Sequence, residues 1–197
     1  MGDRLREMAG RWMAESIVVK QRLVEDPRIL DQALDVAQRC AQACREGNKV
    51  LFMGNGGSAA DAQHLAGEFV SRFNYDRPGL ASFALTVDTS VLTAIGNDYG
   101  YDKLFERQVQ ACARSGDVVV GLSTSGNSVN VIKGLDMARV MGAYTVGMTG
   151  ESGGQMKDKV DACLCMPSRQ TPRIQECHIL IGHVICGLVE QIMFPKD

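Results

Sequence analysis

The chain has 197 residues, of which 45% are apolar and 22% are charged, and its formal net charge is −2. This composition is typical of a folded globular protein and excludes a disordered chain. A near-neutral charge without a long lysine/arginine run argues against nucleic acid as a partner. At this length roughly 70% of the unfolded surface is buried on folding, so we expect one sizeable core in a single domain over residues 1–197.

The N-terminal segment 1–46 predicts two helices. Apolar positions recur at helical spacing over residues 2–24 and again over 27–45. Asp26-Pro27 separates the two helices, because proline restricts the residue before it and suits a first helical turn. A Glu-Gly-Asn sequence then ends the second helix.

After this segment, short apolar strands alternate with helices. We expect strands at 49–53, 81–87, 117–122, 143–148 and 161–166, and helices at 59–73, 90–96, 101–115, 129–141 and 173–192. Such alternation is typical of a parallel sheet that is covered on both faces. The predicted fold is therefore α/β: a doubly wound, five-stranded parallel sheet with helices on both faces, preceded by the N-terminal helices.

Two loops follow predicted strands at the sheet edge where ligands bind in open α/β sheets. The first is Gly54-Asn55-Gly56-Gly57-Ser58, and the second, 123–128, carries hydroxyls on Ser123, Thr124, Ser125 and Ser128. Glycine permits close backbone approach, and the free N–H groups of a helix N-terminus attract anions. These loops fit a phosphomonoester, although neither is a Walker A or GxGxxG loop. Helix capping by Ser and Asn is the alternative for two or three of these residues.

The helix after the first loop carries a row of polar residues, namely Asp61, His64, Glu68 and Arg72. His64 and Glu68 are four positions apart, so they are adjacent on one helix face. A histidine next to a carboxylate suits either a divalent metal or an acid/base pair. A hydrogen-bonded surface pair is the alternative.

The last predicted helix is apolar on nearly every side, so we expect it to be buried and its outer side to be covered by another subunit. The apolar stretch 179–194 is interrupted by polar residues and is too short for a ~20-residue membrane span, and the charged N-terminus lacks a signal core. Buried polar side chains need partners, which here concerns Gln175, Glu176, His178 and His183. His178 lies about 140° from His183 around the helix, so we assign it to packing.

Seven cysteines are present, without a CxxC pair. Because their number is odd and most lie in apolar patterns, we expect reduced and largely buried thiols. Cys163 and Cys165 alternate along a predicted strand. Cys40 and Cys44 lie one helical turn apart, but no third soft ligand is near them in the sequence.

Five segments, taken in chain order, form a combined pattern: GNGGSxxDAxHxxxEF at 54–69, Arg72 with Arg77-Pro78-Gly79, GNDYG at 96–100, GLSTSGNSxNV at 121–131, and RIQE at 173–176 with His183. The pattern resembles bacterial phosphoheptose isomerase, of the sugar isomerase (SIS) domain superfamily, over nearly the whole chain. The serine loop alone indicates only the superfamily. Its combination with Asp61, His64, Glu68, Gln175 and His183 is specific to the isomerase.

The resemblance implies interconversion of sedoheptulose 7-phosphate and D-glycero-D-manno-heptose 7-phosphate, which leads to the nucleotide-activated heptoses of lipopolysaccharide or capsule. It also implies a cytoplasmic homotetramer with active sites at subunit interfaces, in which segment 1–46 takes part in oligomerisation. One zinc ion per subunit and no organic cofactor are expected, the ion being held by His64, Glu68, Gln175 and His183. The residues implied to bind substrate are Asn55, Gly56, Gly57, Ser58, Asp61, Glu68, Arg72, Asn97, Asp98, Ser123, Thr124, Ser125, Ser128 and Gln175.

For catalysis through a cis-enediol, we assign Glu68 as the base at carbon and His183 as the acid/base at oxygen. Metal-bound groups carry protons poorly, so either substrate displaces a ligand or zinc mainly organises the site. Gln175 and His183 are separated by a helical rise of ~12 Å, which favours ligands from different subunits. Some family members have an acidic residue where this chain has Thr171-Pro172, so Asp61 or Asp98 would assist ring opening here.

Two other readings remain open. The first is a non-catalytic SIS-domain protein, either a sugar-phosphate-binding regulator or a tetramer that binds the replication initiator. Such proteins keep the serine loop but lack the complete acid/base set, which this chain has. The second is another enzyme of the superfamily, such as an aminosugar-phosphate isomerase or an etherase.

Overall fold

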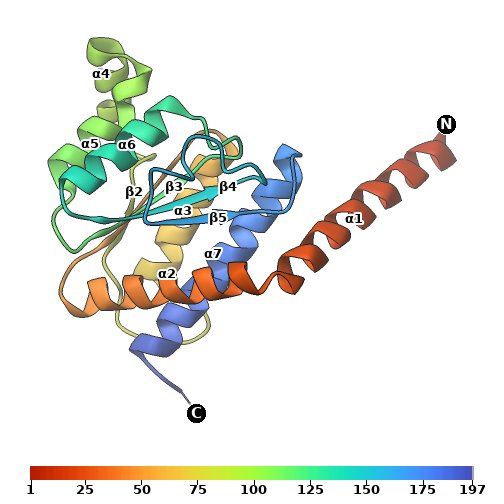
Figure 1. The fold of residues 1–197 in the computed structure, drawn as a ribbon, viewed down its shortest axis with the longest axis horizontal. Coiled ribbons are helices and arrows are strands. Elements are labelled where there is room, and N and C mark those ends of the chain that lie inside the picture. The colour runs from red at the N-terminus through yellow and green to blue at the C-terminus, as the bar shows by residue number, and fades with distance from the viewer. Residues whose placement is uncertain (197) are drawn as a thin grey trace.

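A computed structural model describes residues 1–196 as a three-layer α/β structure with a projecting N-terminal helix (Figure 1). Its elements are, in order, α1 (Gly2–Glu25), α2 (Pro27–Arg45), β1 (Val50–Gly54), α3 (Gly57–Val70), β2 (Ser82–Ala84), α4 (Thr89–Tyr99), the 3-10 helix η1 (Tyr101–Lys103), α5 (Leu104–Cys112), β3 (Val118–Leu122), α6 (Val129–Val140), β4 (Tyr144–Thr149), β5 (Ala162–Cys165) and α7 (Thr171–Met193).

The sheet has five parallel strands in the order β2-β1-β3-β4-β5, as the doubly wound prediction requires. The central pair is in register from Val50 opposite Val118 to Gly54 opposite Leu122. In this order the chain winds outward in both directions from β1 and β3. Open sheets of this kind bind ligands beyond the carboxyl ends of the two strands at such a switch point.

Alternating residues of the strands build a core on each face of the sheet. Val50 and Phe52 join the core beneath α2, α3 and α7, whereas Leu51 and Met53 join the core beneath α4, α5 and α6. Figure 1 shows these two helical layers on opposite sides of the sheet. Because both faces are covered, β1 and β3 are buried along their whole length, which explains their continuous apolar sequences.

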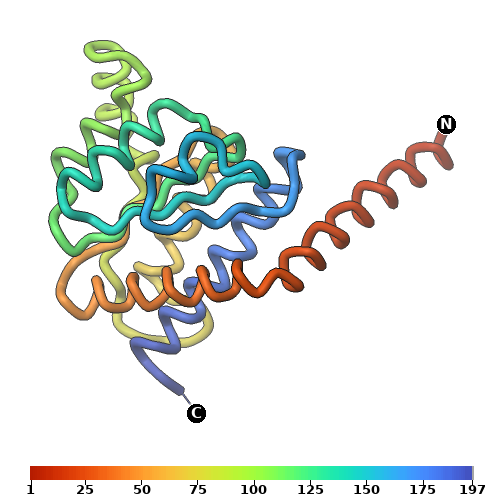
Figure 2. The backbone as a smooth tube through the Cα atoms, in the orientation of Figure 1, coloured from red at the N-terminus to blue at the C-terminus, as the bar shows by residue number. Residues whose placement is uncertain are grey.

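Helix α1 projects from the body of the protein over most of its length (Figure 2). Only its C-terminal end reaches the core, through the buried Leu23. The projecting part leaves large apolar side chains exposed, among them Leu5, Trp12, Met13 and Ile17. At the junction with α2, Asp26 accepts a hydrogen bond from the Arg28 N–H, and Pro27 opens the helix as predicted.

Helix α7 is long and apolar enough to cross a membrane by length and composition alone. Its buried face, however, packs on α2 and α3 and includes the polar residues His178 and Glu190. These contacts make α7 a core helix. The expectation that buried polar residues on it have partners is met for one ring nitrogen of His178: Nε2 lies 3.2 Å from the Thr149 carbonyl oxygen, whereas the buried Nδ1 has no hydrogen-bond partner.

Several element boundaries differ from the sequence prediction, two of them in ways that affect the local structure. The predicted helix 101–115 begins after Gly100, whose φ is +88°, and is divided into η1 and α5; it ends at Cys112, because the chain becomes extended at Ala113. The predicted strand 81–87 forms ladder pairs only over Ser82–Ala84. Beyond it the chain turns toward Asp88, whose side chain accepts a hydrogen bond from the Val91 N–H and caps α4.

Candidate active site

The two predicted loops lie side by side at the carboxyl ends of β1 and β3. Asn55 and Asn130 exchange a pair of amide hydrogen bonds, each of 2.9 Å. Tyr101 donates a third hydrogen bond to the Asn55 side-chain oxygen at 2.9 Å. Sequence reasoning did not single out Asn130 or Tyr101. A polar residue in the first turn of a buried helix was the available signal for Asn130, since such a group needs a partner.

The serine loop gathers its hydroxyls at the start of α6. The Oγ of the buried Ser123 lies 2.8 Å from that of Ser128 and 3.4 Å from that of Ser125. Ser128 is the N-cap residue of α6, yet its side chain makes no capping hydrogen bond. Capping therefore does not explain Ser128. Gly126 turns the loop with a φ of +66°, and Thr124 accepts a hydrogen bond from the Gly150 N–H at 3.0 Å through its carbonyl oxygen.

Three predicted ligands converge from α3 and α7. The His64 Nε2 lies 3.2 Å from the Glu68 Oε1 and 2.8 Å from the His183 Nε2. All three donor atoms lie within 4.8 Å of one another, so His64 and Glu68 are more than a surface pair. Helices α3 and α7 approach closely here, and the absence of a side chain at Gly182 permits this. A Cβ on Gly182 would stand 2.5 Å from a terminal methyl of Leu65.

This triad fits a zinc ion by its chemistry. Two imidazole nitrogens and one carboxylate oxygen form the set of protein ligands found in zinc sites that keep a position open for water or substrate. Half of the His64 side chain is exposed, so the group is open to a ligand. Within residues 1–196 no other three His, Cys, Asp or Glu side chains converge in this way, and Cys40 and Cys44 are not part of such a group.

Gln175, the fourth predicted ligand, lies on α7 beside the first turn of α3 and not beside His64. Its amide nitrogen would be 2.6 Å from a Cβ on Gly57, so it covers the glycine loop at the first turn of α3. His64 lies seven residues further along α3, which corresponds to ~10 Å. Within one chain, Gln175 therefore lies nearer to the predicted sugar loop than to the triad.

The remaining predicted residues are distributed around this helix pair. Asp61 lies on α3 with a buried carboxylate oxygen that has no hydrogen-bond partner, and burial raises the pKa of its carboxyl group. Arg72 is exposed beyond the end of α3. Asn97 donates to Asp98 at 2.8 Å at the exposed end of α4. Among the hydrogen bonds of residues 1–196, none joins this pair to either loop. Their assignment to the sugar therefore stays a prediction.

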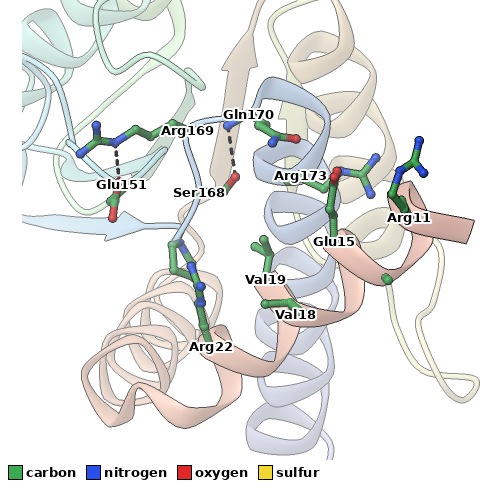
Figure 3. Close-up of a pocket in the computed structure, with 12 residues that line it drawn as sticks. Arg11, Glu15, Val18, Val19, Arg22, Glu151, Ser168, Arg169, Gln170 and Arg173 are labelled. Carbon is green, nitrogen blue, oxygen red and sulfur yellow. Dashed lines mark hydrogen bonds and ion pairs between the residues drawn. The ribbon is translucent and has the colours of Figure 1, made fainter. Parts of the chain in front are cut away.

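Glu176 belongs to a network of hydrogen bonds and ion pairs between α1 and the first turns of α7, outside the site. Its carboxylate accepts hydrogen bonds from Ser16 at 2.5 Å and Lys20 at 3.2 Å, and it pairs with Arg173. A cavity of about 610 Å³ opens beside this network, between α1 and the start of α7 (Figure 3). The cavity contains none of the predicted site residues, so we do not assign catalysis to it.

A buried ion pair holds the C-terminal end of α3. Arg77 pairs with Glu190 of α7 at 3.2 Å and donates to the carbonyl oxygens of Glu68 and Phe69 at 2.7 and 2.6 Å. The Glu190 carboxylate also accepts hydrogen bonds from the backbone N–H groups of residues 73 and 74. Burial alone would raise the pKa of Glu190, but these hydrogen bonds and Arg77 outweigh it and lower the pKa below its usual value. The pair thus anchors the backbone of Glu68 to α7.

Comparison with known proteins gives a consistent set of relatives. The SIS domain family model matches residues 12–150. The chain is 57% identical over 179 residues to the phosphoheptose isomerase of Aneurinibacillus thermoaerophilus, covering 91% of this chain and 90% of that one. It is 55% identical over 183 residues to phosphoheptose isomerase 2 of Campylobacter jejuni subsp. jejuni, covering 93% and 91%.

Solved structures agree with these relatives. The phosphoheptose isomerase of Neisseria gonorrhoeae has a TM-score of 0.89 at 42% identity and covers 95% of this chain and 99% of its own. That of Francisella tularensis has a TM-score of 0.88 at 32% identity, covering 94% and 97%. With the sheet order, the serine loop and the triad, these matches show that the chain belongs to the SIS domain family and, within it, to the phosphoheptose isomerases.

Proposed function

We propose that this chain interconverts sedoheptulose 7-phosphate and D-glycero-D-manno-heptose 7-phosphate. The observation that carries the proposal is the convergence of Glu68 with His64 and His183, because it joins a carboxylate to imidazoles in an open position between α3 and α7. The serine loop at the start of α6 supplies hydroxyls and helix N–H groups for the phosphate. The isomerase names of the relatives support the same reaction.

The reaction moves one proton between C1 and C2 and another between their oxygens. From the ketose, the Glu68 carboxylate takes a proton from C1, which leaves a cis-enediolate, and returns it to C2. The His183 imidazole carries the proton from the oxygen on C1 to the oxygen on C2, so atoms and charge balance. Both steps are general acid/base catalysis by positioned side chains.

A zinc ion, one per subunit, would be held by His64, Glu68 and His183 with Gln175 as a fourth ligand, and it would supply a Lewis acid that polarises the carbonyl and stabilises the negative oxygen. No organic cofactor is needed, because the reaction is redox-neutral overall. Within one chain Gln175 lies beside Gly57, seven residues before His64 on α3. We therefore propose that the fourth ligand comes from a second copy of the chain.

We further propose a homotetramer with active sites between subunits, in which segment 1–46 contributes to assembly. The exposed apolar side chains of α1 and the incompletely covered outer face of α7 support this assembly. The other copy would also bring Asn97 and Asp98 to the sugar. The proposed location is the cytoplasm, and the proposed use of the product is nucleotide-activated heptose for lipopolysaccharide or capsule.

Turnover of sedoheptulose 7-phosphate tests the function directly. We expect Glu68→Gln and His183→Ala each to lower kcat by about 10²–10⁴-fold. Glu106→Gln is the matched control, because Glu106 lies on α5, pairs with Lys103 and is outside both loops, the triad and segment 1–46, and it should keep wild-type turnover. Binding of the sugar phosphate without turnover by the correctly assembled wild-type protein would contradict the proposal and indicate the regulator instead.

A mixing experiment tests the shared site. Gln175→Ala and His183→Ala are purified separately, dissociated, mixed and allowed to reassemble. If ligands come from different subunits, mixed tetramers contain some intact sites and regain part of the activity. If the mixture stays inactive while a mixture with wild-type chain is active, each site draws all its ligands from one chain.

A further inference from the structure

A pair of thiols lies on β5, at the edge of the sheet and outside the candidate active site. Cys163 and Cys165 point to the same side of the strand, and their sulfur atoms lie 3.8 Å apart. Ala162 and Leu164 face the opposite side and are buried in the core, whereas both cysteines are half-buried. The strand alternation noted in the sequence therefore produces a genuine dithiol.

The neighbouring strand makes room for this pair. Gly147 of β4 lies opposite Cys163, where a Cβ would come within 3.4 Å of the sulfur. Thr149 lies opposite Cys165, and its hydroxyl donates to that sulfur at 3.4 Å. A cavity of about 350 Å³ borders both sulfurs and is also lined by Lys157. The dithiol is thus reachable from solvent.

We propose that Cys163 and Cys165 form a chelating dithiolate site for a thiophilic d10 metal ion such as Zn²⁺ or Cd²⁺. Two sulfurs bound to one tetrahedral ion at ~2.3 Å each are ~3.8 Å apart, and the observed sulfur separation is 3.8 Å. The ion therefore requires no movement of β5. Water molecules in the adjoining cavity complete the coordination.

The strand geometry favours chelation over a disulfide. Residues two apart in a strand have Cα atoms ~6.7 Å apart, at the upper limit for a disulfide. The two sulfurs would have to approach from 3.8 Å to ~2.05 Å, which would distort the ladder with β4. Bridging by a metal ion leaves the ladder intact.

Protonation of the pair also suits a metal. The hydrogen bond from Cys163, together with the Thr149 hydroxyl and Lys157, lowers the pKa of Cys165 to about 6 against the opposing effect of burial. The same hydrogen bond raises the pKa of Cys163. Both sulfurs bind the ion as thiolates, so the ion replaces the protons that they carry. By contrast, burial raises the pKa of Cys40 and keeps that thiol protonated.

Titration with Cd²⁺ alone tests the site in the reduced, metal-stripped full-length protein. Thiolate-to-cadmium charge-transfer absorption in the ultraviolet reports only sulfur ligands, so binding at His64, Glu68 and His183 is silent. Cys163→Ser and Cys165→Ser are compared with Cys112→Ser, a matched control at an exposed cysteine at the end of α5. We expect a saturable band at about one ion per chain in the wild type and the control. Cys163→Ser and Cys165→Ser should each weaken Cd²⁺ binding by ~100-fold or more, because the chelate is lost.

Further measurements keep the test independent of folding and of the proposed function. The His183→Ala variant should keep the band, and Cys163→Ser and Cys165→Ser should keep isomerase turnover, which shows that they are folded. Absence of the band in the wild-type protein would overturn the proposal. So would a band of full amplitude and affinity in the Cys163→Ser/Cys165→Ser double variant.

Discussion

Replacing Arg77 by alanine removes the guanidinium that neutralises a fully buried carboxylate. The side chains of Arg77 and Glu190 are only 3% and 0% exposed. Without Arg77, Glu190 keeps only the hydrogen bonds from the N–H groups of Phe73 and Asn74. Leaving one member of a buried ion pair uncompensated costs about 3–5 kcal/mol. The carbonyl oxygens of Glu68 and Phe69 also lose a donor, so the upper part of this range is expected.

Urea denaturation at a fixed protomer concentration measures this loss. The exposed pair of Arg169 with Glu151, also joined through the guanidinium Nε, provides the control, and Arg169→Ala should stay within about 1 kcal/mol of wild type. In a double-mutant cycle, Arg77→Met and Glu190→Gln should together cost at least ~1.5 kcal/mol less than the sum of the single changes. Additivity within ~0.5 kcal/mol would refute the view that the two side chains act as a unit.

The same pair gives a pH dependence with a defined sign. The pKa of Glu190 is lowered in the folded protein from its ordinary 4.5. The unfolded chain therefore takes up a proton first as the pH falls. The stabilisation is complete above about pH 4.5 and is lost as the pH falls through the lowered pKa. In Arg77→Ala this stabilisation should shrink, so the variant should lose less of its remaining stability over this acidic range.

Three other changes have equally specific outcomes. Ser128→Ala should raise KM about 10-fold, the equivalent of one charge-assisted hydrogen bond to the phosphate. It should lower the free energy of unfolding in urea by no more than about 1 kcal/mol, because the side chain makes no capping bond and the buried Ser123 hydroxyl, which loses Ser128, still has Ser125 beside it. Gly57→Ala should lower kcat/KM for the heptose phosphate while leaving the protein folded, since the new methyl displaces the flexible end of Gln175. Burial lowers the pKa of His178 from 6.5 to about 4. Between these two pH values the unfolded chain therefore binds one more proton than the folded protein, and the free energy of unfolding falls by about 3 kcal/mol as the pH drops through them. Urea denaturation across this pH range should show a flatter profile for His178→Asn.

The strands were the most predictable part of the fold. The prediction of 49–53 differs from β1, Val50–Gly54, by one residue at each end, because a parallel strand buried on both faces is a continuous apolar run. The edge strand β2 was harder to predict, since Phe83 is exposed and only three residues pair with β1. Here the turn toward α4 determines where the strand ends, and a local apolar pattern does not contain that information.

The site was predictable in its local parts and less so in its long-range parts. The four-residue spacing of His64 and Glu68 follows from helix geometry. Their contact with His183, 119 residues away in the chain, depends on how α3 packs on α7, and only the family resemblance indicated it. The partners of Asn55 depend on tertiary structure in the same way.

The close contact of Gly182 with Leu65 has a consequence for how this site can vary among related proteins. Leu65 follows His64 in the chain, and Gly182 precedes His183, so the packing of α3 on α7 at this contact also places the two imidazoles near each other. A side chain at position 182 would have to displace the terminal methyls of Leu65, which is buried next to His64. Two apolar positions that take no part in the chemistry therefore help to position the reacting groups.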